Sequence, residues 1–254
     1  MKLIFFIALM AFAVYLLVRR KKQALHQAPD GSAMHLLLVE HVSFYQKLGQ
    51  EEQQVFLKRV QDFLHSVAIT PVKGLALTDL DRLYIASSAI IPIFHFKDWR
   101  YNNLNEVLVY SDAFDHDYST TATGRNITGM VGTGAMNRMM ILSIQAIRAG
   151  FEHSGIHNTG IHEFVHLLDK ADGATDGIPE YMIPKALLKP WISHMHASIQ
   201  AIRSGRSDID TYAGTNEAEF FAVLSEYFFQ KPHLLQEHHP YIFKILKEIY
   251  EPGN

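Results

Sequence analysis

The segment Gly160–Asp169 constrains this chain more than any other, because it places the pattern H-E-x-x-H inside an apolar helical run. His162 and His166 lie four residues apart and therefore project from the same side of an α-helix, where both imidazoles can reach one Zn²⁺. Glu163 is one step further round the helix, so its carboxylate can hold the metal's water and take its proton. The other residues of the segment are mostly apolar, which predicts that the rest of this helix is buried in a core.

A zinc site needs a third protein ligand, and the bare pattern is suggestive rather than decisive, since a chain with fifteen histidines can contain it by chance. One candidate is Asp172, six residues after His166, where zinc proteases with a short spacer carry their third ligand. Those enzymes turn the chain with a glycine at the intermediate position, and here that position is Asp169. This difference weakens the case for Asp172.

The other candidate for the third ligand is Glu219, at the start of a second strongly apolar helix predicted at 216–229. A carboxylate on a helix packed against the first would complete a His, His, Glu site with one position open for water, the arrangement of a catalytic zinc. Asn216 and Glu219 also fit a capping box, in which the acid would only cap the helix. The two roles do not exclude each other, and the residues alone leave the choice of third ligand open.

Composition excludes several other kinds of site. The chain has no cysteine, which rules out disulfides, thiolate zinc sites and cysteine nucleophiles. A formal net charge of −3 gives no sign of nucleic-acid binding. With 254 residues, 48% of them apolar, the chain can form one large core.

The N-terminus predicts a membrane anchor at residues 1–22. Residues 3–18 carry no charge and are followed at once by Arg19–Lys22, which by the positive-inside rule keeps the rest of the chain in the cytoplasm. The run is near the lower limit of about 17 residues for a spanning helix, so a cleaved signal peptide and a buried N-terminal helix are alternatives. A signal peptide would carry its positive charge before the apolar run, which favours a single-pass anchor in the bacterial inner membrane.

The remaining chain predicts a linker at 23–34 and one α+β domain at 35–254, mainly helical with a small mixed sheet. Residues 111–137, rich in glycine, are expected to form a loop and hairpin, and 169–180 a loop over the cleft. A strand directly before the H-E-x-x-H helix could pair its backbone with an extended peptide. The expected helices are 51–67, 78–91, 185–204 and 240–250, and the expected strands are 107–110 and 139–147.

Three stretches of the sequence together resemble a known family. They are His-Glu-x-x-His-Leu-Leu-Asp at 162–169, Ile-Asp-x-Tyr-Ala at 209–213, and Ala-Glu-x-Phe-Ala-Val-Leu-Ser-Glu-Tyr-Phe-Phe at 218–229. Glu-Val-Leu-Val-Tyr at 106–110, followed by Phe114, is also similar. Over roughly residues 50–250 the chain resembles the Mlc titration factor A family of bacterial zinc peptidases. That family belongs to the gluzincins, with some resemblance to the catalytic domain of anthrax lethal factor, and implies a zincin-like fold.

The resemblance implies one Zn²⁺ per chain with His162, His166 and Glu219 as ligands, in preference to Asp172. It implies Glu163 as the general base and Tyr212 as a residue near the metal that stabilises the oxyanion. The activity it implies is hydrolysis of peptide or protein substrates, with aminopeptidase-like cleavage among the alternatives.

The family also implies a partner, because one member binds a transcriptional repressor called Mlc. An alternative function is therefore a membrane-tethered binding protein that sequesters a transcriptional regulator, with peptidase activity secondary or absent. The best-known members of the family are soluble, so the anchor expected here is a departure from the family.

Two further acids are candidates for orienting the ligand histidines. Asp169 could accept a hydrogen bond from an imidazole or could simply be solvated near a helix end. Glu226 lies two turns from Glu219 on about the same face, and a surface ion pair is an equally plausible role for it. The remaining histidines are interpreted as surface residues rather than a second metal site: His194, His196, His233, His238 and His239.

Overall fold

The computed structural model describes residues 30–253, apart from 73, 116, 121–123 and 153–154. The predicted membrane anchor at 1–22 lies outside these residues, as does most of the predicted linker. The last four linker residues, 31–34, form the first turn of helix α2 (Gly31–His41) instead. Within the part of the chain that is described, no helix has the length and apolarity needed to cross a bilayer.

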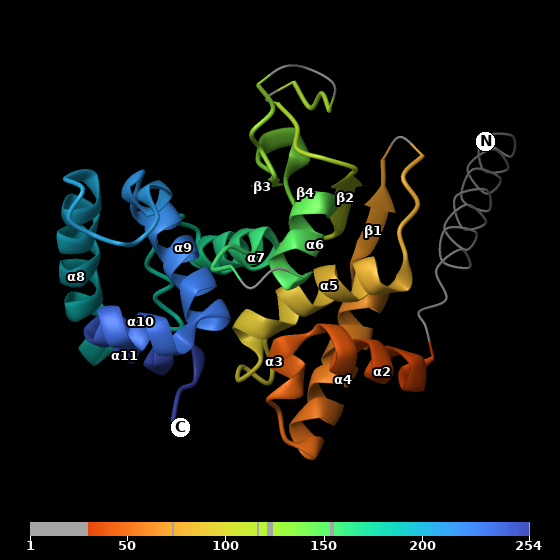
Figure 1. Ribbon diagram of the computed structural model, residues 1–254, viewed down its shortest axis with the longest axis horizontal. Coiled ribbons are helices and arrows are strands. Elements are labelled where there is room, and N and C mark those ends of the chain that lie inside the picture. The colour runs from red at the N-terminus through yellow and green to blue at the C-terminus, as the bar shows by residue number, and fades with distance from the viewer. Residues whose placement is uncertain (1–29, 73, 116, 121–123, 153–154, 254) are drawn as a thin grey trace, which may run out of the picture.

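The described residues form a mainly helical body around one small sheet, as an α+β domain requires (Figure 1). The sheet has the order β1-β2-β4-β3, with β1, β2 and β4 parallel and β3 antiparallel at one edge. The expected mixed sheet is therefore confirmed. Its strands are β1 (Ala68–Pro71), β2 (Glu106–Tyr110), β3 (Gly129–Val131) and β4 (Met139–Ser143).

Strand β1 was not expected from the sequence. Its four residues pair with β2, with Ile69 opposite Val107, and its last residue is Pro71. A proline cannot donate to the next strand, so it is tolerated only because β1 lies at the other edge of the sheet. A segment this short and ending in proline gives no strand pattern by itself.

The strand predicted at 139–147 is wrong in its second half. β4 ends at Ser143, and helix α6 (Ile144–Glu152) begins at the next residue. The Ser143 hydroxyl accepts a hydrogen bond from the backbone N–H of Ala146 at 3.3 Å, so it caps the first turn of α6. A serine inside the predicted strand is therefore the signal that ends it.

The first helices lie together below the strands in Figure 1, where α4 packs against α5 and α2 packs against both. Helix α5 starts with a capping box, in which Asp81 N–H donates to the Thr78 hydroxyl at 3.1 Å and Thr78 N–H donates to the Asp81 carboxylate at 2.8 Å. The helix ends at Ile90, close to the predicted end at 91, and Pro92 lies in the 3-10 turn that follows. This layer comprises α2, α3 (Ser43–Gln46), α4 (Gln50–Ser66), α5 (Asp79–Ile90) and η1 (Ile91–Ile93).

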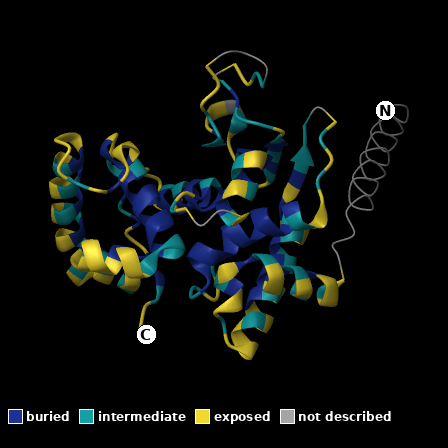
Figure 2. Cartoon of the chain, viewed as in Figure 1, coloured by how far each residue is buried: buried dark blue, intermediate teal, exposed yellow. Residues whose placement is uncertain are grey.

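Helix α7 (Thr159–Asp169) carries the H-E-x-x-H pattern and lies in the middle of the molecule. Figure 2 shows that α7, α5 and α9 are the most buried part of the chain. A Cβ on Gly160 would lie 2.2 Å from the Ser88 hydroxyl oxygen of α5, so only glycine allows the two helices to approach this closely. The expectation of a buried α7 is confirmed.

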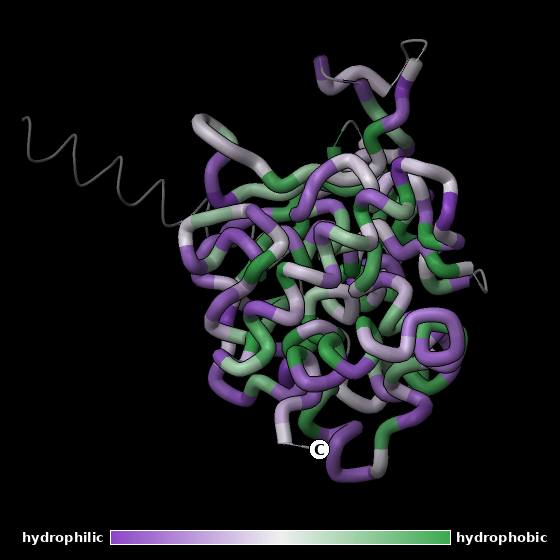
Figure 3. Tube along the Cα trace, turned by 90° about the vertical axis from the view of Figure 1, so that its left-hand side faces the viewer, coloured by the Kyte–Doolittle hydropathy of each residue, from purple (hydrophilic) through white to green (hydrophobic). Residues whose placement is uncertain are grey.

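The C-terminal half forms a second group of helices around α9, and α8 continues through Pro190 as predicted. Short helix α10, which the sequence pattern did not indicate, precedes the predicted last helix. In Figure 3 hydrophobic stretches of the chain lie mainly inside the body and hydrophilic ones at its periphery. This group comprises η3 (Lys170–Asp172), α8 (Lys185–Arg203), η4 (Thr211–Gly214), α9 (Glu217–Gln230), α10 (Pro232–His238) and α11 (Pro240–Tyr250).

Candidate metal centre

Helices α7 and α9 bring together the three residues expected to hold a metal. The Nε2 atom of His162 lies 2.9 Å from a carboxylate oxygen of Glu219, and the Nε2 atom of His166 lies 3.3 Å from the same oxygen. The two Nε2 atoms are 3.1 Å apart. Among the described residues this is the one group of three or more histidine, aspartate or glutamate side chains, all within 4.8 Å, that could hold an ion.

The capping alternative for Glu219 is correct in part. The side chain of Asn216 accepts a hydrogen bond from the Glu219 N–H at 2.9 Å and so caps α9. The Glu219 carboxylate faces the two histidines. Asp172, the other candidate, is exposed, and its carboxylate accepts hydrogen bonds from the N–H groups of Ala174 and Glu180 within its own loop.

Glu226 orients the first histidine, and the surface ion pair considered for it is wrong. One of its carboxylate oxygens lies 2.7 Å from Nδ1 of His162, and the other accepts a hydrogen bond from the N–H of Asn158. Only 4% of Glu226 is exposed. Asn158 also caps α7, because its side chain accepts from the N–H of Ile161. A carboxylate that holds Nδ1 leaves Nε2 of the same imidazole to face a metal.

The cluster favours a positive charge. Burial alone would lower the pKa of His162, but its hydrogen bonds to Glu219 and Glu226 raise that pKa to about 10. Although burial acts in the opposite direction, hydrogen bonds from the two histidines hold the pKa of Glu219 well below its usual range. Two imidazoles and one carboxylate in a buried, negatively charged environment are a donor set that fits a divalent cation.

Asp169 is fully buried, so the alternative of a solvated acid is wrong. One carboxylate oxygen accepts a hydrogen bond from the Gly177 N–H at 2.9 Å, and burial raises the pKa of Asp169 to about 6. Within the described residues the second oxygen has no hydrogen-bond partner, and neither has the buried Nδ1 of His166. This hydrogen bond ties Gly177, in the segment 169–180, back to the end of α7.

The carboxylate of Glu163 lies under strand β3. Only 7% of this residue is exposed, and a Cβ on Gly129 would lie 2.5 Å from the Glu163 Cγ. Any other residue at position 129 would displace either the strand or the acid. Burial raises the pKa of Glu163, and the two histidines partly offset this rise. From the sequence, Gly129 was one of several glycines in a predicted loop. A glycine inside a short strand is the signal that another side chain, here that of Glu163, approaches the strand closely.

Tyr212 lies beside the cluster, on η4. The Asp210 carboxylate accepts a hydrogen bond from the Tyr212 N–H at 2.7 Å, and the tyrosine ring centre is 5.9 Å from that of His162. The side chain reaches solvent, with 53% of the residue exposed. Partial burial and the carboxylates of Glu219 and Glu163 raise the pKa of Tyr212 to about 12. Its hydroxyl is therefore a hydrogen-bond donor at neutral pH.

A cleft of about 550 Å³ opens over this group. Residues 126–129 form one wall, and His157 and Asp210, whose side chains lie 3.5 Å apart, are among those lining it. The segment predicted as a loop and hairpin at 111–137 thus contributes to the cleft, whereas no described residue of 169–180, expected over the cleft, lines it.

Five further histidines lie at or near the surface: His194, His196, His233, His238 and His239. His238 and His239 both contact the carboxylate of Asp208, at 2.6 and 2.7 Å, and the ring of His194 stacks on Tyr241. His196 and His233 are exposed. Their interpretation as surface residues is confirmed for these positions.

Fold and cluster define the class: a mainly helical, metallopeptidase-like domain with a candidate metal centre on an H-E-x-x-H helix. The model of the family described as glucose-regulated metallo-peptidase M90 matches residues 16–251, and the chain belongs to this family.

Curated relatives agree with the resemblance seen in the motifs. The chain is 30% identical to Mlc titration factor A of Pectobacterium atrosepticum, over 80% of each chain. It is 29% identical to the protein of the same name from Serratia proteamaculans, over 80% of this chain and 81% of the relative. An uncharacterized protein of Synechocystis is 31% identical over 91% of this chain and 87% of its own length. The assignment to the Mlc titration factor A family is therefore confirmed.

Proposed function

We propose that this protein is a zinc-dependent metallopeptidase, which hydrolyses peptide bonds with one Zn²⁺ held by His162, His166 and Glu219. The observation that carries the proposal is the convergence of these three donors next to the buried carboxylate of Glu163. Two imidazoles and one carboxylate form a donor set of catalytic zinc, which keeps a fourth position for water or substrate.

The remaining residues have roles that follow from their positions. Bound at this site, Zn²⁺ supplies Lewis acidity toward water and the scissile carbonyl. Glu163 accepts the proton of the attacking water and passes it to the leaving amine, and burial, which raises its pKa, makes it a stronger base for this step. The Tyr212 hydroxyl donates a hydrogen bond to the carbonyl oxygen as negative charge develops there.

Strand β3 supports a peptide as the substrate. It is the antiparallel edge of the sheet, and its residue Gly129 approaches the side chain of Glu163. An extended peptide that paired with this edge would bring its backbone next to the base. Residues 126–129, which include the first residue of β3, line the cleft.

A matched pair of proteins tests the proposal. Full-length wild type and Glu163→Gln are purified, and bound zinc and cleavage of a peptide library are measured side by side. We expect one zinc in both proteins and a loss of about 10²–10⁴-fold in hydrolysis for the variant. Glu217→Gln is the control, because Glu217 lies on the same helix as Glu219 with its side chain 46% exposed. Cleavage positions in the library separate aminopeptidase-like from internal cleavage.

Two results would change the conclusion. Undiminished cleavage by Glu163→Gln would remove Glu163 as the base. Zinc in both proteins without cleavage of any peptide would favour the second candidate function, a binding protein that sequesters a transcriptional regulator. What supports this second candidate is the name of the relatives, which describes them as titrating Mlc.

We also propose that residues 1–22 anchor the protein in the bacterial inner membrane with the domain facing the cytoplasm. The uncharged run 3–18 followed by four basic residues supports this location. Membrane fractionation of the full chain, with protease added to spheroplasts from outside, tests it. Recovery in the soluble fraction, or digestion from outside, would exclude it.

A further inference from the structure

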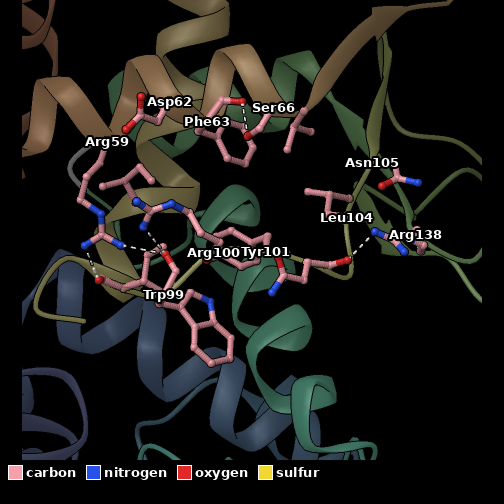
Figure 4. Close-up of a pocket in the computed structure, with 14 residues that line it drawn as sticks. Arg59, Asp62, Phe63, Ser66, Trp99, Arg100, Tyr101, Leu104, Asn105 and Arg138 are labelled. Atoms are coloured by element: carbon pink, nitrogen blue, oxygen red, sulfur yellow. Dashed lines mark hydrogen bonds between the residues drawn. The ribbon is translucent and has the colours of Figure 1, made fainter. Parts of the chain in front are cut away.

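A second cavity, of about 310 Å³, is lined by residues of α4 and of the segment after η1, among others (Figure 4). Phe164 points about 200° away from His162 and His166 around the helix, since each residue turns by about 100°. Its ring contacts the rings of Phe63 and Tyr101, with centres 5.6 and 5.2 Å apart, and both of these residues line the cavity. Phe164 therefore packs α7 against the lining of the second cavity, on the side away from the metal centre, and the two sites have no lining residue in common.

One wall of the cavity is apolar. Phe63 comes from α4, and Tyr101 and Leu104 come from the segment after η1; all three are buried. The Tyr101 hydroxyl donates to the carbonyl oxygen of Ala89 at 2.8 Å, which leaves the ring as the surface offered to the cavity. We call these three residues the apolar wall.

Two guanidinium groups meet at one end of the cavity (Figure 4). Arg59, only 7% exposed, donates to the carbonyl oxygens of Ile93 and Phe94, both at 2.7 Å. Arg59 and Arg100 also donate to one and the same carbonyl oxygen, that of Trp99, at 3.5 and 2.9 Å. Burial and the charge of Arg100 lower the pKa of Arg59. Two like charges are thus held together in a partly desolvated place.

No carboxylate in the described part of the chain pairs with either arginine. Asp62 is the one acid among the described lining residues, and it pairs with Lys58 on the outer face of α4. A buried charge is ordinarily paired, so Arg59, with the exposed Arg100 beside it, favours an anion from outside the chain.

A third guanidinium, that of Arg138, lies at the opposite rim (Figure 4). Its backbone has a φ of 65°, a left-handed conformation that non-glycine residues rarely adopt. Its carbonyl oxygen accepts from the Asn105 N–H at 2.7 Å, and its side chain donates to the carbonyl oxygen of Asn102 at 2.6 Å. These bonds hold the charge at the mouth of the cavity.

We propose that this cavity binds a small organic anion, whose carboxylate or phosphate group lies between Arg59 and Arg100 and whose apolar body lies on the apolar wall. Guanidinium groups match both oxyanions through paired N–H donors. The volume is at the lower end of the range for ligand pockets, which restricts the ligand to a small molecule. The proposal does not depend on the hydrolytic activity.

Calorimetric titration of the full-length protein tests it with four probes: hexanoate, hexyl phosphate, inorganic phosphate and hexanol. We expect hexanoate or hexyl phosphate to bind, and the tighter of the two identifies the class of anion. Hexanol, which lacks the charge, and inorganic phosphate, which lacks the apolar body, should bind at least about tenfold more weakly. Equal binding of hexanol, or no binding of either organic anion, would overturn the proposal.

Variants locate the binding. Arg100→Gln should lower the affinity for the organic anion at least about tenfold, because it removes one charged donor group. Arg100→Lys should recover part of that affinity. Arg100 is exposed, so these variants should fold. Lys97→Gln is the matched control, an exposed cation of the same loop outside the cavity lining, and should bind like wild type. Glu219→Ala separates this site from the metal centre, because it changes only the metal centre. If the organic anion no longer bound to Glu219→Ala but still bound to Arg100→Gln, the proposal would be overturned.

Discussion

Two regions of the molecule, on opposite sides of helix α7, carry opposite excess charges. On the side facing α9, the carboxylates of Glu163, Glu219 and Glu226 surround two imidazoles. On the side facing α4, Arg59 and Arg100 meet at one carbonyl oxygen. The same helix thus separates a region suited to a cation from a region suited to an anion.

A third region contains an arginine that pairs with a carboxylate. Arg148 donates two hydrogen bonds to the carboxylate of Asp81, at 2.7 and 2.8 Å, and the acid is only 2% exposed. Arg59 is only 7% exposed, but its guanidinium donates to backbone carbonyl oxygens and pairs with no carboxylate among the described residues. The two arginines therefore differ in the charge of their partners.

The largest expected effect is on the cation side. Glu219→Ala should lower zinc affinity by more than about 100-fold, because loss of a direct ligand exceeds the effect of losing an outer partner. Zinc content after dialysis, and the rise in melting temperature on adding zinc, measure it. Glu217→Ala, two residues earlier on α9, is the control and should keep its metal. A Glu219→Ala protein with full zinc would refute the ligand assignment.

The second prediction concerns the residue between the two regions. Phe164→Ala should lower the free energy of unfolding by about 3–5 kcal/mol, since a fully buried ring is lost from the contact with Phe63 and Tyr101. Urea unfolding followed by circular dichroism measures it. Phe243→Ala is the control. Phe243 is half-buried on α11, so this substitution should lower the free energy of unfolding by less. Equal costs at the two positions would show that α7 is not held from this side.

The third prediction separates a ligand from the residue that orients it. Glu226→Gln should weaken zinc binding by about 10–100-fold, less than Glu219→Ala, because the amide still reaches Nδ1 of His162 without the negative charge. Competition with a zinc-binding dye gives both affinities. An effect as large as that of Glu219→Ala would place Glu226 among the direct ligands.

Much of this arrangement could be predicted from local signals. The helices α4, α5, α8 and α11 follow from periodicity and from caps such as Thr78. The H-E-x-x-H spacing predicts that His162 and His166 share a face. The pairing with Glu219 was chosen by resemblance, because the sequence could not decide between it and Asp172.

The rest depends on contacts between distant segments. β1 becomes a strand only by pairing with β2, and Gly129 matters only because β3 crosses Glu163. Arg59 and Arg100 show no pattern in the sequence, and their shared carbonyl oxygen follows from the packing of α4 against the loop after η1. Two arginines that meet in this way, with no acidic partner among the described residues, produce no periodic pattern in the sequence.

The smallest expected effect concerns the difference between an arginine that pairs with a carboxylate and one that does not. Burial raises the pKa of Asp81, but hydrogen bonds from Arg148 and Thr78 outweigh it and lower that pKa below its usual 3.8. The pair therefore contributes stability above pH 3.8 and loses it as the pH falls through the folded-state pKa. Arg148→Met should cost about 1–2 kcal/mol at neutral pH, a reduced figure because the Arg148 side chain is 40% exposed.

Urea unfolding of Arg148→Met and wild type at several pH values measures this difference, which should shrink below pH 3.8. Arg100→Met is the matched substitution in the cavity. Because no carboxylate among the described residues pairs with Arg100, its cost should not change over the same pH range. A cost that fell in parallel with that of Arg148→Met would mean that Arg100 has an acidic partner within the chain, and the contrast between the two arginines would be lost.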